Sequence, residues 1–144
     1  MYLSRDVDYV LPPSTRIAML AEAMGSVGFN RTGDRYNHPN SRFFVEFPAG
    51  PLAIGSDLAP RPVRVRRGRV VAWSLSATDS CRDRLAAHYH WKDRQALRVA
   101  LEIALRNRLL IERIRVWSKA EGCLPQFEEF QRALRRAKSR RRRR

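Results

Sequence analysis

The sequence predicts an α+β protein in which a small mixed sheet is followed by a C-terminal all-helical lobe. Segments with alternating or β-branched residues occur only before residue 76, whereas residues 76–131 are nearly free of glycine and proline and repeat their apolar residues at helical spacing. This change in pattern defines three regions: a partial α/β domain over 1–75, a helical lobe over 76–131, and a basic tail over 132–144 that we expect to be disordered.

The first predicted strand and helix carry recognisable end signals. Charged and apolar residues alternate over 6–11, which predicts a strand, and the pair Pro12-Pro13 ends it. Ser14 is expected to cap a helix whose apolar residues recur at helical spacing. Gly25 or Gly28 is expected to close that helix.

The rest of this region is expected to contain one strong strand and one hairpin. Residues 29–41 are rich in Asn, Gly, Asp and Pro, and they predict a loop with at most one short strand. The run RFFVEF at 42–47 predicts a strand. The apolar segments 63–65 and 70–73 predict the two strands of a hairpin that turns near Gly68.

Four helices are predicted in the lobe. Ser76 and Asp79 resemble a capping box, so a helix is expected over 77–90. Further helices are expected over about 93–107 and 110–120, and a fourth begins after Pro125 and runs into the arginines. The residues expected on their buried faces are Leu85, Ala86, Tyr89, Leu97, Ala100, Leu101, Ala104, Leu105, Ile111, Ile114, Trp117, Phe127, Phe130 and Leu134.

The positive charge of the chain is concentrated near its end. The sequence holds 29 Lys and Arg against 14 Asp and Glu, and nine of the basic residues lie in 132–144, which contains no acid. The other 131 residues therefore carry only +6 of the formal +15. The tail is suited to sequence-independent contact with nucleic-acid phosphates, or it is a solvated chain end. A second cluster, Arg61, Arg64, Arg66, Arg67 and Arg69, is expected at the solvated turn of the hairpin, where it could also touch a phosphate backbone.

The composition argues against secretion and membrane insertion. No stretch approaches the roughly 20 apolar residues of a spanning helix, and the first ten residues lack the apolar core of a signal peptide. Cys81 and Cys123 are too few for a disulfide framework. We therefore expect a cytoplasmic protein with reduced thiols and no membrane partner.

Three acidic residues are the candidates for chemistry. Asp6 and Asp8 lie two apart on a strand, so their carboxylates project from the same face and repel each other unless a cation lies between them. Glu46 lies inside a hydrophobic strand and would join them if the two strands are neighbours. The three could then hold Mg²⁺ or Mn²⁺. In the alternative interpretation all three are ordinary surface charges, while Phe44 and Tyr36 pack the core.

The segment Ser4-Arg5-Asp6-Val7-Asp8-Tyr9, followed by a helix and then by Phe44-Val45-Glu46-Phe47, resembles the nucleotidyltransferase superfamily. That superfamily includes DNA polymerase beta and the minimal and abortive-infection-type nucleotidyltransferases of prokaryotes. The resemblance implies that Asp6, Asp8 and Glu46 are catalytic metal ligands. It also implies transfer of a nucleotidyl group from a nucleoside triphosphate to a hydroxyl on nucleic acid or protein.

The helical lobe resembles the abortive-infection-type members as well. The segments Cys81-Arg82-Asp83-Arg84-Leu85-Ala86-Ala87 and Trp91-Lys92-Asp93-Arg94 are similar to the helical part that follows the sheet in those proteins. The resemblance implies that Arg84, Lys92 and Asp93 help to place the nucleotide, with Lys92 as a phosphate contact.

One element of the family pattern is missing. The family carries Gly-Gly or Gly-Ser about a dozen residues before its Asp-x-Asp pair, whereas only five residues precede Asp6 here and none is glycine. We therefore expect a nucleotidyltransferase-type sheet that is incomplete at its N-terminal side, with impaired catalysis unless the full gene supplies the missing element. The alternative is a non-catalytic module that binds nucleic acid or a protein partner through its basic face and tail.

Overall fold

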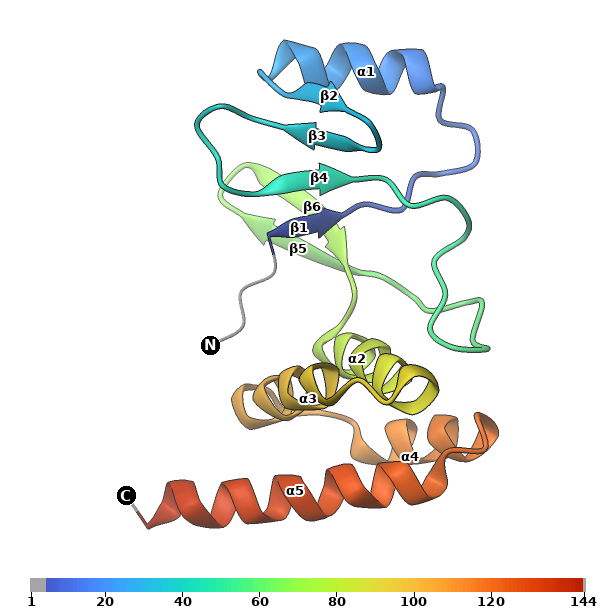
Figure 1. The fold of residues 1–144 in the computed structure, drawn as a ribbon, viewed down its shortest axis with the longest axis vertical. Coiled ribbons are helices and arrows are strands. Elements are labelled where there is room, and N and C mark those ends of the chain that lie inside the picture. The colour runs from blue at the N-terminus through green and yellow to red at the C-terminus, as the bar shows by residue number, and fades with distance from the viewer. Residues whose placement is uncertain (1–4, 144) are drawn as a thin grey trace. The chain divides into compact units, whose positions relative to one another are not determined.

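The computed structural model describes residues 5–143 and confirms the α+β class. Ser4, which the family resemblance places just before the aspartates, and Arg144 of the basic tail lie outside the described residues. The backbone divides into two compact units between Leu52 and Ala53, so we describe residues 1–52 as unit 1 and residues 53–144 as unit 2 (Figure 1).

Unit 1 is a four-stranded mixed sheet with one helix. Its elements are β1 (Asp6–Asp8), α1 (Ile17–Ser26), β2 (Asn30–Thr32), β3 (Arg35–Asn37) and β4 (Phe44–Glu46). The strand order is β1-β4-β3-β2, in which β1 and β4 run parallel and the other neighbours are antiparallel. Helix α1 lies beside β2, at the opposite end of the sheet from β1 (Figure 1).

The register gives this sheet one apolar and one polar face. Val7 lies opposite Val45, which in turn lies opposite Tyr36. Tyr36 and Val45 are buried, and the Phe47 ring packs edge-on against Tyr36 at a centroid distance of 5.5 Å. Because side chains alternate along a strand, the residues next to these valines point to the other face, which is the one that carries the acids.

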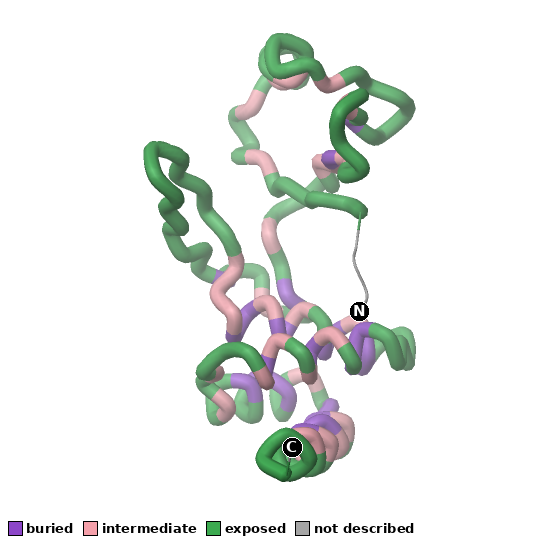
Figure 2. The backbone as a smooth tube through the Cα atoms, turned by 90° about the vertical axis from the view of Figure 1, so that its left-hand side faces the viewer, coloured by how far each residue is buried: buried purple, intermediate pink, exposed green. Residues whose placement is uncertain are grey.

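Unit 2 combines a hairpin with four helices. Its elements are β5 (Val63–Arg67), β6 (Val70–Ser74), α2 (Ala77–Trp91), α3 (Arg94–Arg106), α4 (Ile111–Ala120) and α5 (Leu124–Arg142). Strands β5 and β6 pair antiparallel, which confirms the predicted hairpin, and Gly68 has a φ of 60° in the two-residue turn. Every residue of both strands is exposed (Figure 2).

The first helix of unit 2 begins at its predicted cap, and the four helices share one core. The Ser76 Oγ accepts a hydrogen bond from the Asp79 backbone N–H, as the capping-box prediction requires. The core contains eleven of the fourteen side chains predicted to be buried, and Leu101, Leu105 and Ile111 pack at its edge. Buried residues accordingly gather on the inward faces of the helices (Figure 2).

Two predictions in unit 1 are wrong in detail. Residues 29–41 form two strands and not a loop with one at most, because Gly33 adopts a φ of 60° and turns the chain back between β2 and β3. The first strand ends at Asp8, and α1 begins after Arg16 without a side-chain cap, so Ser14 is not its N-cap.

The boundary between the units and the form of the tail also differ from the predictions. Residues 53–75 belong to unit 2 and not to the sheet, because Ile54 is buried in the helical core and the Asp57 carboxylate pairs with Arg82 at 2.6 Å. The predicted disordered tail is helical through Arg142, as the last part of α5. Arginine is a good helix former, and the buried Phe130 and Leu134 anchor the helix on which the arginines continue.

None of the helices within residues 5–143 combines the length and the apolarity needed to cross a membrane.

Candidate metal centre

The pairing of β1 with β4 brings the three predicted acids onto one face of the sheet. In this parallel pair Asp8 lies directly opposite Glu46, and Asp6 lies opposite Phe44. Asp6 and Asp8 project from the same face because they are two residues apart on an extended strand. The condition set by the sequence, that the strand of Glu46 neighbours the strand of the aspartates, is therefore met.

The carboxylate oxygens of these residues lie within reach of a single cation. One oxygen from each of Asp6, Asp8 and Glu46 can be chosen so that all three lie within 4.8 Å of one another. Ligands of Mg²⁺ lie about 2.1 Å from the ion, so two opposite ligands are about 4.2 Å apart and two adjacent ones about 3 Å. The 4.8 Å limit is slightly wider than these separations, so the side chains would have to close in on the ion to coordinate it. Among the described residues this is the one group of three acids, histidines or cysteines that meets such a distance test.

Arg35 is a fourth participant that the sequence did not reveal. Its Nε donates to Glu46 Oε1 at 2.8 Å, and its guanidinium carbon lies 4.4 Å from the centre of the Phe44 ring. Arg35 reaches Glu46 because β3 pairs antiparallel with β4 and places these two residues opposite each other. The sequence signal for this contact would have been a second strand within residues 29–41, whose composition predicts mainly loop.

The three acids lie on an accessible face of the sheet. Asp6 and Asp8 are exposed and Glu46 is partly buried. Oxygen ligands on an accessible face also leave coordination positions for water or for phosphate oxygens, as Mg²⁺ requires.

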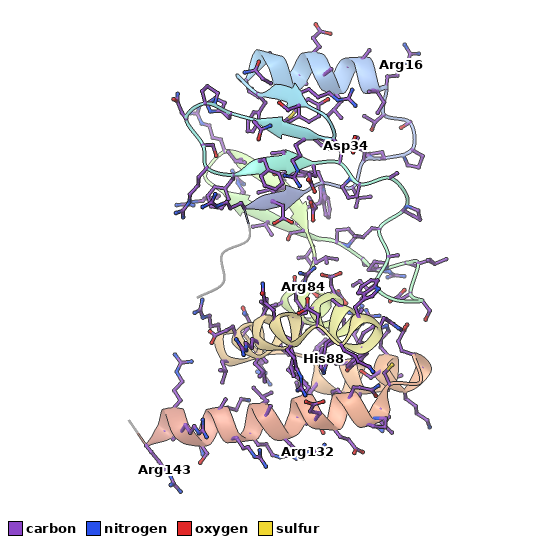
Figure 3. All side chains as sticks on the ribbon, in the orientation of Figure 1. Arg16, Asp34, Arg84, His88, Arg132 and Arg143 are labelled. Carbon is purple, nitrogen blue, oxygen red and sulfur yellow. The ribbon has the colours of Figure 1, made fainter. Side chains whose placement is uncertain are left out.

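The three residues predicted to place the nucleotide belong to unit 2 and do not form one cluster. Arg84 lies on α2 (labelled in Figure 3), and Lys92 is the residue in left-handed conformation that ends this helix. Eight residues separate them, which is about 12 Å along a helix axis. Arg84 forms an ion pair with its neighbour Asp83 at 2.6 Å.

Asp93 has a structural role as a helix cap. Its Oδ1 accepts hydrogen bonds from the backbone N–H groups of Gln95 and Ala96, at 2.7 and 3.0 Å, and so caps the first turn of α3. The acid that the family resemblance assigns to the nucleotide site is therefore also a helix cap in this chain.

Arg82 is a buried charged residue of unit 2 that the sequence did not single out. Its guanidinium donates to Asp79 Oδ1 at 2.8 Å and to Asp57 Oδ2 at 2.6 Å, and it lies over the Trp117 ring at 5.0 Å. The hydrogen bond from Arg82 lowers the pKa of the Asp57 carboxyl, with help from the Ala59 backbone N–H. These contacts fasten the segment 53–59 to the helices, so Arg82 is a structural residue.

The positive charge lies on unit 2. Residues 1–52 contain five arginines and five acids and are neutral, so the whole formal charge of +15 belongs to residues 53–144. Helix α5 carries much of it, with Arg132 near its middle and Arg143 just beyond its end (Figure 3). The Arg141 Nη1 donates to the Leu105 carbonyl at 3.1 Å, which ties the basic end of α5 to α3.

Comparison of the chain with protein-family models, with curated proteins and with solved structures gives no match. Its function is therefore inferred from the geometry of its own residues.

Proposed function

We propose that unit 1 binds a divalent cation through Asp6, Asp8 and Glu46 and acts in nucleotidyl transfer from a nucleoside triphosphate. The observation that carries this proposal is the convergence of the three carboxylates within 4.8 Å on one sheet face. The resemblance of the Asp6-Val7-Asp8 and Phe44-Val45-Glu46-Phe47 segments to nucleotidyltransferases supplies the reaction class.

The reaction would join an acceptor hydroxyl to the α-phosphorus of the triphosphate. The bond from that phosphorus to the oxygen bridging to the β-phosphorus breaks, pyrophosphate leaves, and the hydroxyl proton is released. Mg²⁺ or Mn²⁺ would supply positive charge for the phosphate oxygens at this point. The contribution of the chain is to fix three oxygen ligands on two adjacent strands, with Arg35 holding the Glu46 carboxylate in place.

The test is an incorporation assay on the full chain. Each of the four ribonucleoside triphosphates, labelled at the α-phosphate, is incubated with the protein, Mn²⁺ and either mixed short RNAs or the protein alone. The proposal expects label in an RNA or a protein band, lost on chelation and lost in Asp8→Asn. The variant Asp34→Asn, which changes an exposed acid on the β2–β3 turn, is the matched control and should retain the activity. Absence of label with every triphosphate and both acceptors would refute the transfer step.

A second candidate function, nucleic-acid binding, is favoured by α5. The helix presents most of the basic residues of 132–144 on a continuous element, and no acid interrupts them. A cationic helix of this kind neutralises several phosphates and binds without sequence preference. Such binding would serve an enzyme whose acceptor is a nucleic acid, and it would equally serve a non-catalytic module.

Deletion of residues 135–144 tests this second function. We expect the deletion to weaken binding to duplex DNA and to RNA at low salt and to reduce the slope of log affinity against log salt. A variant in which the arginines of this segment are replaced by lysines keeps the charge and should keep the salt slope. Unchanged affinity after the deletion would show that α5 does not contact the nucleic acid.

A further inference from the structure

The hairpin of β5 and β6 has two different faces, both exposed. The register pairs Arg64 with Trp73 and Arg66 with Val71. These four side chains share one face of the ribbon, which we call the Arg–Trp face. The opposite face carries the small and β-branched residues of the two strands together with Arg67.

Trp73 is the most informative residue of the Arg–Trp face. Its relative exposure is 67%, although an indole is one of the largest apolar groups that a protein can bury. Within unit 2 the other two tryptophans are Trp117, which is buried in the helical core, and Trp91, which ends α2 and is 77% exposed. Trp73 is therefore distinguished by its place across the ribbon from Arg64 and not by its exposure alone. An exposed tryptophan on an extended ribbon, directly across from an arginine, needs an explanation outside the packing of the core.

The charge of the hairpin points to an anionic partner. Residues 61–74 contain five arginines and no acid. The hairpin itself therefore offers no acid with which these five arginines could pair. The Arg66 Nε donates to the Gly68 carbonyl at 2.9 Å, which holds this side chain along the ribbon near its tip. A row of guanidinium groups that no acid of the hairpin neutralises, beside an exposed aromatic ring, matches a polyanion that also carries flat rings.

We infer that the Arg–Trp face of this hairpin binds single-stranded nucleic acid, with Trp73 stacking on a base and Arg64 and Arg66 contacting phosphates. Every base presents a flat face to an indole, so binding is tolerant of sequence. Bases in a duplex are stacked on one another, so Trp73 cannot contribute to duplex binding in this way. The inference does not rest on the metal centre of unit 1, and it assigns to the hairpin a contact different from the phosphate contacts of α5.

The experiment compares Trp73→Ala and Trp73→Phe with the wild type and with Trp91→Ala. The probe is a fluorescein-labelled oligouridylate of about twelve nucleotides, within the range of single-strand site sizes, and binding is followed by anisotropy. Trp73→Ala should weaken binding about ten- to a hundredfold, while Trp73→Phe, which keeps a stacking ring, should recover most of the affinity. Trp91→Ala changes a tryptophan of similar exposure on the same unit and should bind as the wild type does.

Two further measurements separate this inference from its alternatives. A nucleic-acid duplex of the same length should bind the Trp73→Ala variant and the wild type with equal affinity. The double variant Arg64→Gln with Arg66→Gln should lower the salt slope for the oligouridylate by about 1.4, which is the value for two phosphate contacts on a single strand.

The inference is overturned if Trp73→Ala binds the oligouridylate as tightly as the wild type does, or if it loses duplex and single-strand binding equally. It is also overturned if the substitution changes the sedimentation of the free chain and leaves oligouridylate binding intact. In that case the hairpin would be a surface for a second copy of this chain. Far-UV circular dichroism should be unchanged in all these variants, because every residue of the two strands is exposed.

Discussion

Replacement of Arg82 by methionine should strongly destabilise unit 2. The Arg82 side chain is 3% exposed and pairs with Asp79, whose side chain is 1% exposed. Methionine fills a similar volume but leaves the Asp79 carboxylate buried without its closest charge partner. Removing one member of a buried ion pair typically costs 3–5 kcal/mol. Arg113 lies 3.2 Å from the same Asp79 oxygen and compensates in part, so we expect about 3 kcal/mol, at the low end of this range.

The assay is urea unfolding of the full chain, followed by the far-UV circular dichroism of the helices. Arg84→Met is the matched control, because Arg84 lies on the same helix and its ion pair with Asp83 is largely exposed. It should cost less than about 1 kcal/mol. The double variant Arg82→Met with Asp79→Asn also removes the buried Asp79 charge, so it should be more stable than Arg82→Met alone. The account of the buried pair is contradicted if Arg82→Met lowers the free energy of unfolding no more than Arg84→Met does. It is also contradicted if the double variant is the least stable of the three variants.

Three other predictions concern the helical unit. Asp93→Ala should lower the free energy of unfolding by about 1 kcal/mol, because α3 loses its cap. Asp93→Asn should be nearly neutral in the same urea assay. Equal stability of the wild type and both variants would contradict the capping role of Asp93. Burial raises the pKa of the Cys81 thiol to about 12. Iodoacetamide at pH 8.5 should therefore leave Cys81 unmodified in the folded chain and label it in urea, as mass spectrometry of the peptides would show. Rapid labelling of Cys81 in the native chain would contradict its burial. Because the pKa of Asp57 is lowered, this carboxylate contributes stability that is present above its ordinary pKa of 3.8 and lost as the pH falls below that value. Asp57→Asn should therefore flatten the acid side of a plot of the free energy of unfolding against pH. An unchanged acid side would show that the bond to Arg82 is not coupled to folding.

The convergence of the acids could be predicted from the sequence, because this convergence depends on simple local rules of strand structure. Alternation along a strand placed Asp6 and Asp8 on one face, and the hydrophobic neighbours of Glu46 marked a second strand. The helices of unit 2 were predictable for the same reason, because their apolar residues recur with a fixed period and Ser76 marks a start. Local patterns of this kind are visible without any knowledge of tertiary contacts.

Contacts between distant segments could not be predicted. Arg35 reaches Glu46 only through the antiparallel register of two strands, each of which contains just three residues. Arg82 looked like any other helical arginine, because its partner Asp57 comes from a loop 25 residues earlier. The helical form of the tail was missed because the run of basic residues was interpreted as a solvated chain end, whereas arginine has good helix propensity and Phe130 anchors α5.

Direct titration with Mn²⁺ tests the central claim, that Asp6, Asp8 and Glu46 form a cation site. Electron paramagnetic resonance of the free ion should show one bound Mn²⁺ per chain, displaced by Mg²⁺. Asp8→Asn and Glu46→Gln should each weaken binding by at least about tenfold, whereas Asp34→Asn should bind as the wild type does. Calorimetry should give the same order of affinities. If the wild type binds no Mn²⁺, or if Asp8→Asn binds it as tightly as the wild type, the three carboxylates are surface charges and the proposed centre does not exist.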